Sequence, residues 1–265
     1  MRPDILSQGE GNHDRLNVPF QVRTYDSLPS TNQYCELLDL TQTEEFTVIC
    51  ARQQTAGIGQ RGNHWASEPG KNLTFSLILK PTFIPPAKQY QLTKAVSLGI
   101  TDHLRTLVPT SADLKIKWPN DIYVNGRKIC GILISNKISG VRLAASIIGI
   151  GLNANQSQFP EWVPNPIALC QLTQQYVDLD TLLHNLLQAI ALRYAQLTTA
   201  PDILDREYLA QLLYLGQEHL FYYHDRPILA TIQGVNTFGH LQLTTADGEA
   251  LTCQLKEIAF ATSAQ

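Results

Sequence analysis

The sequence predicts an α+β fold: a mixed β-sheet with flanking helices, followed by a small all-β module. Apolar periods typical of strands and of helices alternate along the chain up to about residue 214. From residue 216, short apolar runs alternate with turn signals, which is typical of a small β-barrel. Because 44% of the 265 residues are hydrophobic and 16% are charged, the chain can build a full core.

Composition excludes several classes of protein. Twenty Lys and Arg residues against 23 Asp and Glu give a net charge of -3, so no broad cationic surface is available for a nucleic-acid backbone. Polar residues interrupt every apolar run before the roughly 18 residues that a membrane-spanning helix needs. The N-terminus lacks the apolar block of a signal peptide, and five cysteines show no metal-ligand spacing. We therefore expect a cytoplasmic protein with reduced thiols, which binds neither nucleic acid nor membrane.

The elements expected in the first half follow a loose leader at residues 1–19. Strands are expected at 20–25, 46–53 and 72–79, helices at 30–40 and 87–107, and a turn at 26–29. Ser30 or Thr31 can cap the first helix, because a short hydroxyl side chain satisfies a free backbone N–H there. Apolar and polar residues alternate at 72–79, which predicts a strand buried on one face only.

In the second half, Asn125-Gly126 predicts a tight hairpin, because a type I′ turn needs positive φ at both central positions. We expect further strands at 114–118, 121–124, 128–135 and 141–150, and helices at 180–197 and 202–213. The final module holds apolar runs at 220–223, 228–232, 241–243, 251–253 and 258–260. The domain boundaries are therefore drawn at 20–214 for the mixed domain and 215–265 for the β module.

A glycine-rich segment at residues 54–70, here called the glycine loop, matches the dinucleotide pattern G-x-G-x-x-G between Gly57 and Gly62. That interpretation needs a helix after the motif and an acidic residue about 20 positions later, and the sequence offers neither. A plain surface loop is the simpler alternative, but it leaves Arg61 and Trp65 unexplained. Backbone amides, one Arg and one Trp suit an anionic ligand with a planar part.

The densest group of polar residues lies on the predicted hairpin between Lys115 and Leu133. Lys128 stands in an otherwise apolar strand; such a lysine is either solvated on an outer face or available to an anion. Gly131 in mid-strand indicates the close approach of something bulky. Asp121 is either a turn residue or, with the amide of Asn120, a ligand for Mg²⁺ or a ribose.

Together these segments resemble the biotin protein ligases. The matching stretches occur in the order of that family and cover about residues 25–155: Ser30-Thr31-Asn32, Gln53 to Gly62, Lys117 to Asp121, Arg127 to Leu133 and Gly149 to Asn153. The resemblance implies a catalytic domain related to class II aminoacyl-tRNA synthetases and an SH3-like C-terminal barrel. It also implies a two-step reaction, in which biotin and ATP form biotinyl-5′-AMP and a lysine of a biotin carboxyl carrier domain then takes the biotinyl group.

The resemblance also assigns roles to residues. It places four side chains against the biotin ureido ring: Ser30, Thr31, Asn32 and Gln54. It implies that the backbone of Gly57, Ile58, Gly59 and Gln60 closes over biotin. It also implies that Arg61 and Lys128 are the catalytic cations and that Gly131 forms the floor of the pocket. It places Trp65, Lys117, Asn120, Asp121, Leu152 and Asn153 on the nucleotide side. Mg²⁺ would arrive with ATP, and its protein ligands are not identified.

Two departures from the family pattern are notable. Family loops commonly read G-R-G-R-R-G, whereas Ile58 and Gln60 stand here at two of the basic positions. Fewer than 25 residues precede the first predicted strand, so we expect a single-function enzyme without the N-terminal DNA-binding domain that some relatives carry. The resemblance also makes a homodimer plausible. The alternatives are a lipoate or octanoate ligase, whose R-R-x-S-G-G-G-x-V-x-H-D loop is absent, and a non-enzymatic adaptor that binds nucleotide.

Overall fold

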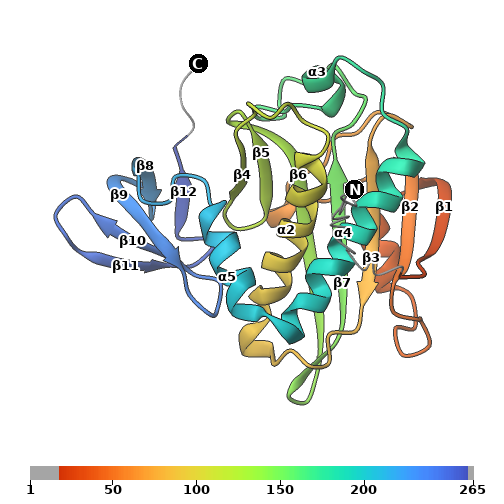
Figure 1. The fold of residues 1–265 in the computed structure, drawn as a ribbon, viewed down its shortest axis with the longest axis horizontal. Coiled ribbons are helices and arrows are strands. Elements are labelled where there is room, and N and C mark those ends of the chain that lie inside the picture. The colour runs from red at the N-terminus through yellow and green to blue at the C-terminus, as the bar shows by residue number, and fades with distance from the viewer. Residues whose placement is uncertain (1–17, 262–265) are drawn as a thin grey trace, which may run out of the picture.

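The computed structural model describes residues 18–261, and the part of the expected leader at 1–17 lies outside them. Seven strands form the main sheet in the order β1-β2-β3-β7-β6-β5-β4 (Figure 1). Their bounds are β1 Gln21–Leu28, β2 Thr47–Gln54, β3 Leu73–Leu79, β4 Leu114–Lys117, β5 Asp121–Val124, β6 Arg127–Ser139 and β7 Arg142–Leu152. Strand β1 runs parallel to β2, and every other neighbouring pair in this sheet is antiparallel. The expected mixed sheet is therefore confirmed.

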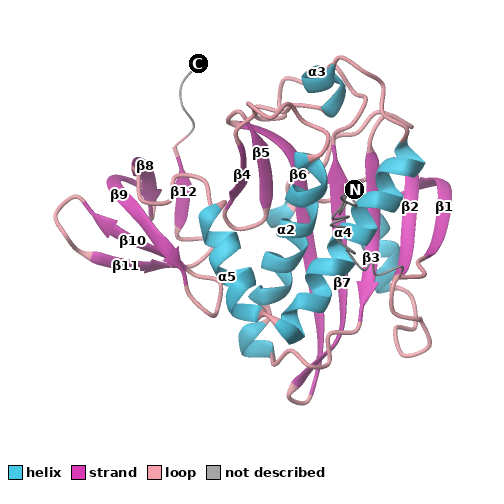
Figure 2. Cartoon of the chain, viewed as in Figure 1, coloured by secondary structure: helices cyan, strands magenta, loops and turns pink. Residues whose placement is uncertain are grey.

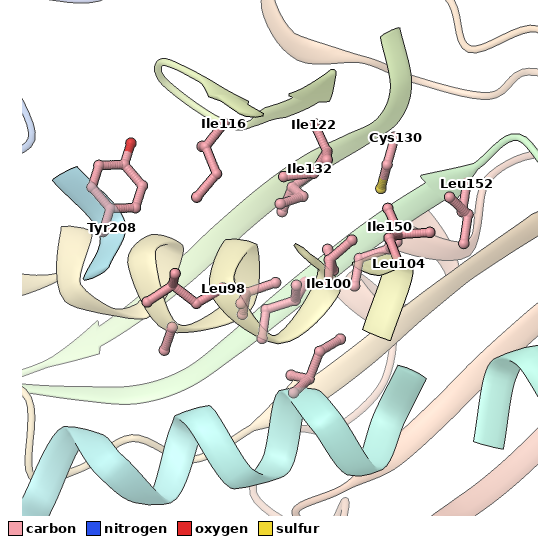
Figure 3. Close-up of a cluster of buried hydrophobic side chains, with 14 of the residues drawn as sticks. Leu98, Ile100, Leu104, Ile116, Ile122, Cys130, Ile132, Ile150, Leu152 and Tyr208 are labelled. Atoms are coloured by element: carbon pink, nitrogen blue, oxygen red, sulfur yellow. The ribbon is translucent and has the colours of Figure 1, made fainter. Parts of the chain in front are cut away.

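Helices cover both faces of this sheet, as Figure 2 shows for the larger layer. On one face lie α2 (Tyr90–Arg105), α4 (Leu179–Thr199) and α5 (Pro201–Ala210). Figure 3 shows Leu98, Ile100 and Leu104 of α2 in one cluster with apolar side chains of the sheet strands. The short α1 (Thr31–Glu36) covers the other face through a second cluster that includes Cys35. Because both faces are covered, β3 is buried at all seven positions instead of on one face only.

The C-terminal module is a five-stranded antiparallel sheet in the order β11-β10-β9-β8-β12. Its strands are β8 Glu218–Tyr223, β9 Arg226–Val235, β10 Leu241–Thr245, β11 Ala250–Cys253 and β12 Ile258–Phe260, and each contains one of the predicted apolar runs. Within residues 18–261 the two end strands, β11 and β12, do not pair with each other. The sheet is therefore open, and the expected SH3-like barrel is not confirmed.

The module is attached to the main domain next to the β4–β5 hairpin. The indole Nε1 of Trp118 donates to the carbonyl of Gly239 over 2.9 Å. Tyr90 donates to the carbonyl of Pro119 over 2.9 Å, and its hydroxyl lies 2.7 Å from that of Tyr208. A Cβ on Gly239 would lie 2.4 Å from the ring of Tyr90, so only glycine permits this close contact. The module therefore supports the chain that leads into β5.

Several expected boundaries need correction. The predicted turn at 26–29 is instead the end of β1, which runs to Leu28 because it pairs with β2. Helix α1 is shorter than expected and ends at Glu36, and α5 ends at Ala210. The residues after α5 instead pair with β4 through Leu212. The hairpin turn is confirmed, with φ of 50° at Asn125 and 73° at Gly126. The remaining short helices are η1 Gln60–Gly62, η2 Pro86–Lys88 and α3 Leu169–Thr173.

No helix within residues 18–261 is long and apolar enough to cross a membrane.

Candidate active site

A cavity of about 150 Å³ lies between the glycine loop and the main sheet and is here called the first cavity. It brings together residues that are far apart in the sequence. Those that the sequence predicted are Ser30, Thr31, Asn32, Gln54, Ile58, Gly59, Gln60, Trp65, Asn120, Asp121, Lys128 and Gly131. The structure thus places most of the predicted biotin-side residues around one space, together with part of the predicted nucleotide side.

One end of the first cavity is lined with neutral polar side chains. Ser30 caps α1 by accepting from the backbone N–H of Gln33 over 3.5 Å, which fixes the start of the helix. The backbone N–H of Thr31 donates to Oε1 of Gln54 over 2.7 Å, so the amide of Gln54 is held in one orientation. Asn32 donates to the carbonyl of Leu133 over 3.2 Å. Among the described side chains, this end offers hydroxyls and amides but no charge.

The floor of the first cavity consists of three glycines, Gly131 of β6 with Gly149 and Gly151 of β7, here called the glycine floor. Gly131 and Gly151 lie opposite each other in the sheet register. The indole of Trp65 lies on them: a Cβ on Gly151 would be 2.3 Å from Cε2 of the ring. A Cβ on Gly149 would be 2.3 Å from Oδ1 of Asn32. Any side chain at these positions would displace a residue of the cavity wall.

A β-bulge aims Lys128 into the cavity. Ile122 of β5 pairs with Cys130 and Tyr123 pairs with Lys128, so Ile129 is an extra residue on β6. A bulge of this kind reverses which face the preceding side chain points to. Cys130 is therefore buried in the core, whereas Lys128 shares the face of Gly131, where a Cβ would be 3.2 Å from Nζ. In a regular strand, by contrast, Lys128 and Cys130 would lie on the same face.

Lys128 forms an ion pair with Asp121 across the hairpin, with 2.8 Å between Nζ and Oδ1. Its Nζ also lies 5.7 Å from the ring centroid of Trp65. About a quarter of each charged side chain is exposed, 27% for Lys128 and 23% for Asp121, so an entering ligand can reach both. The neighbouring Asn120 is buried and donates to the carbonyl of Ile132.

A second cavity, of about 420 Å³, lies on the far side of Trp65. Trp65 and Lys128 line both cavities, and Asn153, Trp162 and several prolines line the second. Asn153 donates to the carbonyl of Ile167 over 3.1 Å, which leaves its buried Oδ1 without a hydrogen-bond partner among the described residues. The buried Nε1 of Trp65 lacks a partner there as well. Unpaired buried polar atoms are costly, so both atoms are suited to a ligand.

Three predicted residues lie elsewhere. Lys117 points toward the C-terminal module, with Nζ 3.2 Å from the hydroxyl of Tyr123 and 5.1 Å from the ring centroid of Phe260. Burial lowers the pKa of this lysine. Leu152 is buried in the core, so a ligand could meet only its backbone. Gly57 packs against the backbone of Trp65 behind the first cavity.

For Arg61 the structure describes only the backbone, which belongs to η1, and its side chain lies outside the described part. Its predicted role therefore stays a prediction.

Sequence reasoning missed three contributors to the site. Gly149 and Gly151 were treated only as part of a matching segment, although glycines two apart in a strand share one face and could have indicated the floor. Trp162 was not singled out. Ser76 belongs to the strand for which alternation predicts one exposed face, but it is fully buried beneath Thr31 and Asn32.

Comparisons with known proteins identify relatives of this chain. Residues 25–153 match the sequence model of the Biotin/lipoate A/B protein ligase family. The Bifunctional ligase/repressor BirA of Salmonella typhimurium is 32% identical over 231 residues, which cover 85% of this chain and 68% of that protein. The Biotin--[acetyl-CoA-carboxylase] ligase of Paracoccus denitrificans is 34% identical over 155 residues, 57% of this chain and 64% of that protein.

The chain matches a smaller part of some other relatives. The matched region of the BirA of Bacillus subtilis, at 33% identity, is 66% of this chain but 54% of that protein, so the chain spans about half the length of that relative. Among solved structures, a biotin protein ligase from Aquifex aeolicus in complex with biotin and ATP shares the fold, with a TM-score of 0.75 and 23% identity over 92% of this chain and 99% of that one. The chain therefore belongs to the biotin/lipoate A/B protein ligase family.

Proposed function

We propose that this protein is a biotin–protein ligase, which activates biotin with ATP to biotinyl-5′-AMP and transfers the biotinyl group to a lysine of a biotin carboxyl carrier domain. One observation carries the proposal. Lys128 and Trp65 line two adjoining cavities, so a single ammonium group lies where the ends of two ligands would meet. Two related proteins, a biotin protein ligase in complex with biotin and ATP and a biotin--[acetyl-CoA-carboxylase] ligase, support this choice of substrates.

The first cavity suits biotin. The ureido ring is neutral, with two N–H donors and one carbonyl, and the uncharged end formed by Ser30, Thr31 and Gln54 offers matching hydroxyl and amide groups. The glycine floor and Trp65 leave an apolar passage for the ring system and the acyl chain. A biotin oriented this way directs its carboxylate at Lys128.

The second cavity suits the nucleotide. Trp162, Val163 and Pro164 supply apolar walls for a base, and the unpaired Oδ1 of Asn153 can accept from an N–H or hydroxyl donor. We propose that Asn120 and Asp121 contribute polar groups between the two ligands. Lys117 and Leu152 act there only indirectly, since the ammonium of Lys117 lies against Phe260 and Tyr123.

The first chemical step joins two anions. A carboxylate oxygen attacks the α-phosphorus, the new O–P bond forms, and pyrophosphate leaves with the electrons of the bond to the α-phosphate. Repulsion between the reactants makes positive charge the main requirement. Lys128 can exchange its contact with Asp121 for contacts with both ligands, and we propose Arg61 of the glycine loop as the second cation. Each charge-assisted contact contributes about 1.5–3 kcal/mol.

In the second step the neutral amine of the carrier lysine attacks the acyl carbon of biotinyl-5′-AMP. The C–N bond forms, the acyl C–O bond breaks, AMP leaves, and the amine loses its proton. No covalent enzyme intermediate is needed. The thiols near the site are unsuited to one, because burial raises the pKa of Cys50 to about 11 and that of Cys130 well above its ordinary value.

We propose that Mg²⁺ enters with ATP and is held mainly by the phosphates. Within residues 18–261, no three His, Cys, Asp or Glu side chains are grouped to hold a metal ion. Asp121 is the single carboxylate of the first cavity, and it already pairs with Lys128. When bound, the ion would neutralise phosphate charge and orient the leaving pyrophosphate.

The partner we propose is a biotin carboxyl carrier domain of a carboxylase in the cytoplasm, with the ligase itself as a monomer or homodimer. The deciding experiment mixes the protein with biotin, ATP, Mg²⁺ and an apo carrier domain, followed by a streptavidin blot and intact mass. We expect a single biotinyl adduct that needs ATP and is lost when the acceptor lysine is replaced by arginine. Parallel reactions with lipoate and octanoate should give no adduct. An adduct with lipoate in place of biotin, or none at all, would refute the proposal.

A further inference from the structure

Ser76 lies at the centre of β3, with no exposed surface, directly beneath the uncharged end of the first cavity. Its hydroxyl contacts the two residues that begin α1: Oγ lies 2.8 Å from Oγ1 of Thr31 and 2.5 Å from Oδ1 of Asn32. Thr31 in turn contacts Oε1 of Gln54, with its Oγ1 at 3.2 Å and its backbone N–H at 2.7 Å. Ser76 does not line the cavity, but it touches two residues that do.

The orientation of Asn32 determines where the proton of Ser76 goes. The Nδ2 of Asn32 donates to the carbonyl of Leu133, so its Oδ1 is the atom that faces Ser76. A carboxamide oxygen can only accept. At 2.5 Å this contact needs a proton between the two oxygens, and Ser76 is the donor.

The protons of the two hydroxyls then have only one good arrangement. Three oxygen–oxygen contacts, at 2.5, 2.8 and 3.2 Å, share the two protons of Ser76 and Thr31. The side-chain oxygen of Gln54 can also only accept, so its contact with Thr31 carries the proton of Thr31. Ser76 therefore donates toward Asn32 and Thr31, and Thr31 donates to Gln54.

We propose that Ser76 is a positioning residue that sets the hydrogen-bond polarity of the ureido site. Ser76 donates to Thr31 Oγ1 while Gln54 takes the proton of Thr31, so this hydroxyl is fixed with its remaining lone pair toward the cavity as an acceptor for a ligand N–H. Oε1 of Gln54 already accepts from the backbone of Thr31, so the Nε2 of Gln54 remains as a donor for a ligand carbonyl. Acceptor and donor side by side match a cyclic urea. This inference rests on the proposed function.

The alternative is that Ser76 only stabilises the fold. Thr74 provides a matched control that separates the two roles. Thr74 lies two residues earlier on β3, is 2% exposed, and donates to the carbonyl of Ala51 over 2.8 Å. It lines neither cavity. Both Ser76→Ala and Thr74→Val therefore remove one buried hydroxyl from the same strand, but only the first removes a partner of Thr31.

The experiment measures biotin affinity by calorimetry and the KM values of the full chain. We expect Ser76→Ala to raise the biotin Kd and the biotin KM at least tenfold and to leave the ATP KM within twofold of wild type. Thr74→Val should change the biotin Kd less than twofold. In a Thr31→Val background, the effect of Ser76→Ala should shrink below threefold, because the residue through which it acts is gone. If Ser76→Ala does not fold, Ser76→Cys takes its place, because a thiol is a weak donor of similar shape. We then expect the biotin Kd to rise at least fivefold.

Each other outcome has a definite meaning. Equal biotin Kd values for Ser76→Ala and Thr74→Val would overturn the role of Ser76 and leave the proposed function standing. A full tenfold effect that persists in the Thr31→Val background would overturn the route through Thr31. A wild-type protein that does not bind biotin would overturn the proposed function and this inference with it.

Discussion

Lys128 and Asp121 face each other across the β5–β6 hairpin, with 2.8 Å between Nζ and Oδ1. The bulge at Ile129 makes this pair possible, because it turns Lys128 out of the core and onto the face of the glycine floor. The ammonium is therefore held at the junction of two cavities before any ligand arrives. A positive charge fixed in advance stabilises developing negative charge without reorganisation during the reaction.

Replacement of Lys128 tests the chemical role of this ammonium. We expect Lys128→Ala to keep the fold, since a quarter of the side chain is exposed, and to reduce biotin-dependent ATP–pyrophosphate exchange at least tenfold. Lys115 of β4 is a suitable control, because it lies on the strand next to β5, has a 34% exposed side chain and lines neither cavity. Lys115→Ala should exchange within twofold of wild type. An unchanged rate in Lys128→Ala would contradict the assignment.

The glycine floor makes a steric prediction. A Cβ on Gly151 would lie 2.3 Å from the ring of Trp65, so the indole must move and both cavities change shape. We expect Gly151→Ala to raise the biotin Kd at least tenfold, measured by calorimetry, without loss of stability in urea. Gly234 of β9 is the control, since the nearest atom to its added Cβ is 3.7 Å away. Equal affinity in Gly151→Ala and Gly234→Ala would show that Trp65 is not fixed by the floor.

The buried thiol of Cys35 is expected to make the protein less stable at alkaline pH. Burial beneath α1 raises its pKa from 9.0 to about 12, because the charged thiolate is poorly solvated there. A pKa raised in the folded state stabilises the protein below pH 9, and this contribution is lost as pH rises from 9 toward 12. In urea unfolding at pH 8.0 and 10.5, wild type should lose more stability than Cys35→Ala. Equal losses would indicate that Cys35 is not the group responsible.

Two glycines in turns of the C-terminal module allow the cost of backbone strain to be measured apart from the cost of a packing clash. Gly239 has φ of +88° and touches the ring of Tyr90, whereas Gly248 has φ of +85° and open space around it. Alanine at either position costs about 1–3 kcal/mol in backbone strain. Gly239→Ala should cost at least about 1 kcal/mol more than Gly248→Ala in urea unfolding, because its Cβ would collide with Tyr90. Equal costs would mean that the module does not pack tightly against α2.

Much of the fold could be predicted from local signals. The Asn125-Gly126 turn, the apolar period of α4 and the five short runs of the module depend on nearby residues alone, and each matches an observed element. Boundaries failed where distant pairing decided them. Strand β1 continues through the predicted turn because it pairs with β2 up to Leu28. Strand β3 is buried on both sides because α1 covers the face that its polar residues occupy.

The site was predicted less completely than the fold, for physical reasons. The family resemblance identified the polar end, and a lysine in an otherwise apolar strand indicated Lys128. The position of Lys117 could not be predicted, since Phe260 lies in the module, far along the chain. The bulge at Ile129 and the burial of Ser76 depend on how strands and α1 pack together. Alternation along one strand does not contain that information.

The central claim is that the ammonium of Lys128 contacts both ligands at once. It is tested most directly by a crystal structure of the protein with biotin and a non-reactive ATP analogue. We predict that Nζ leaves Asp121 and lies within hydrogen-bond distance of both the biotin carboxylate and the α-phosphate, with Trp65 between the two ring systems. A structure in which Nζ stays on Asp121 or points into solvent, with both ligands bound, would contradict the account.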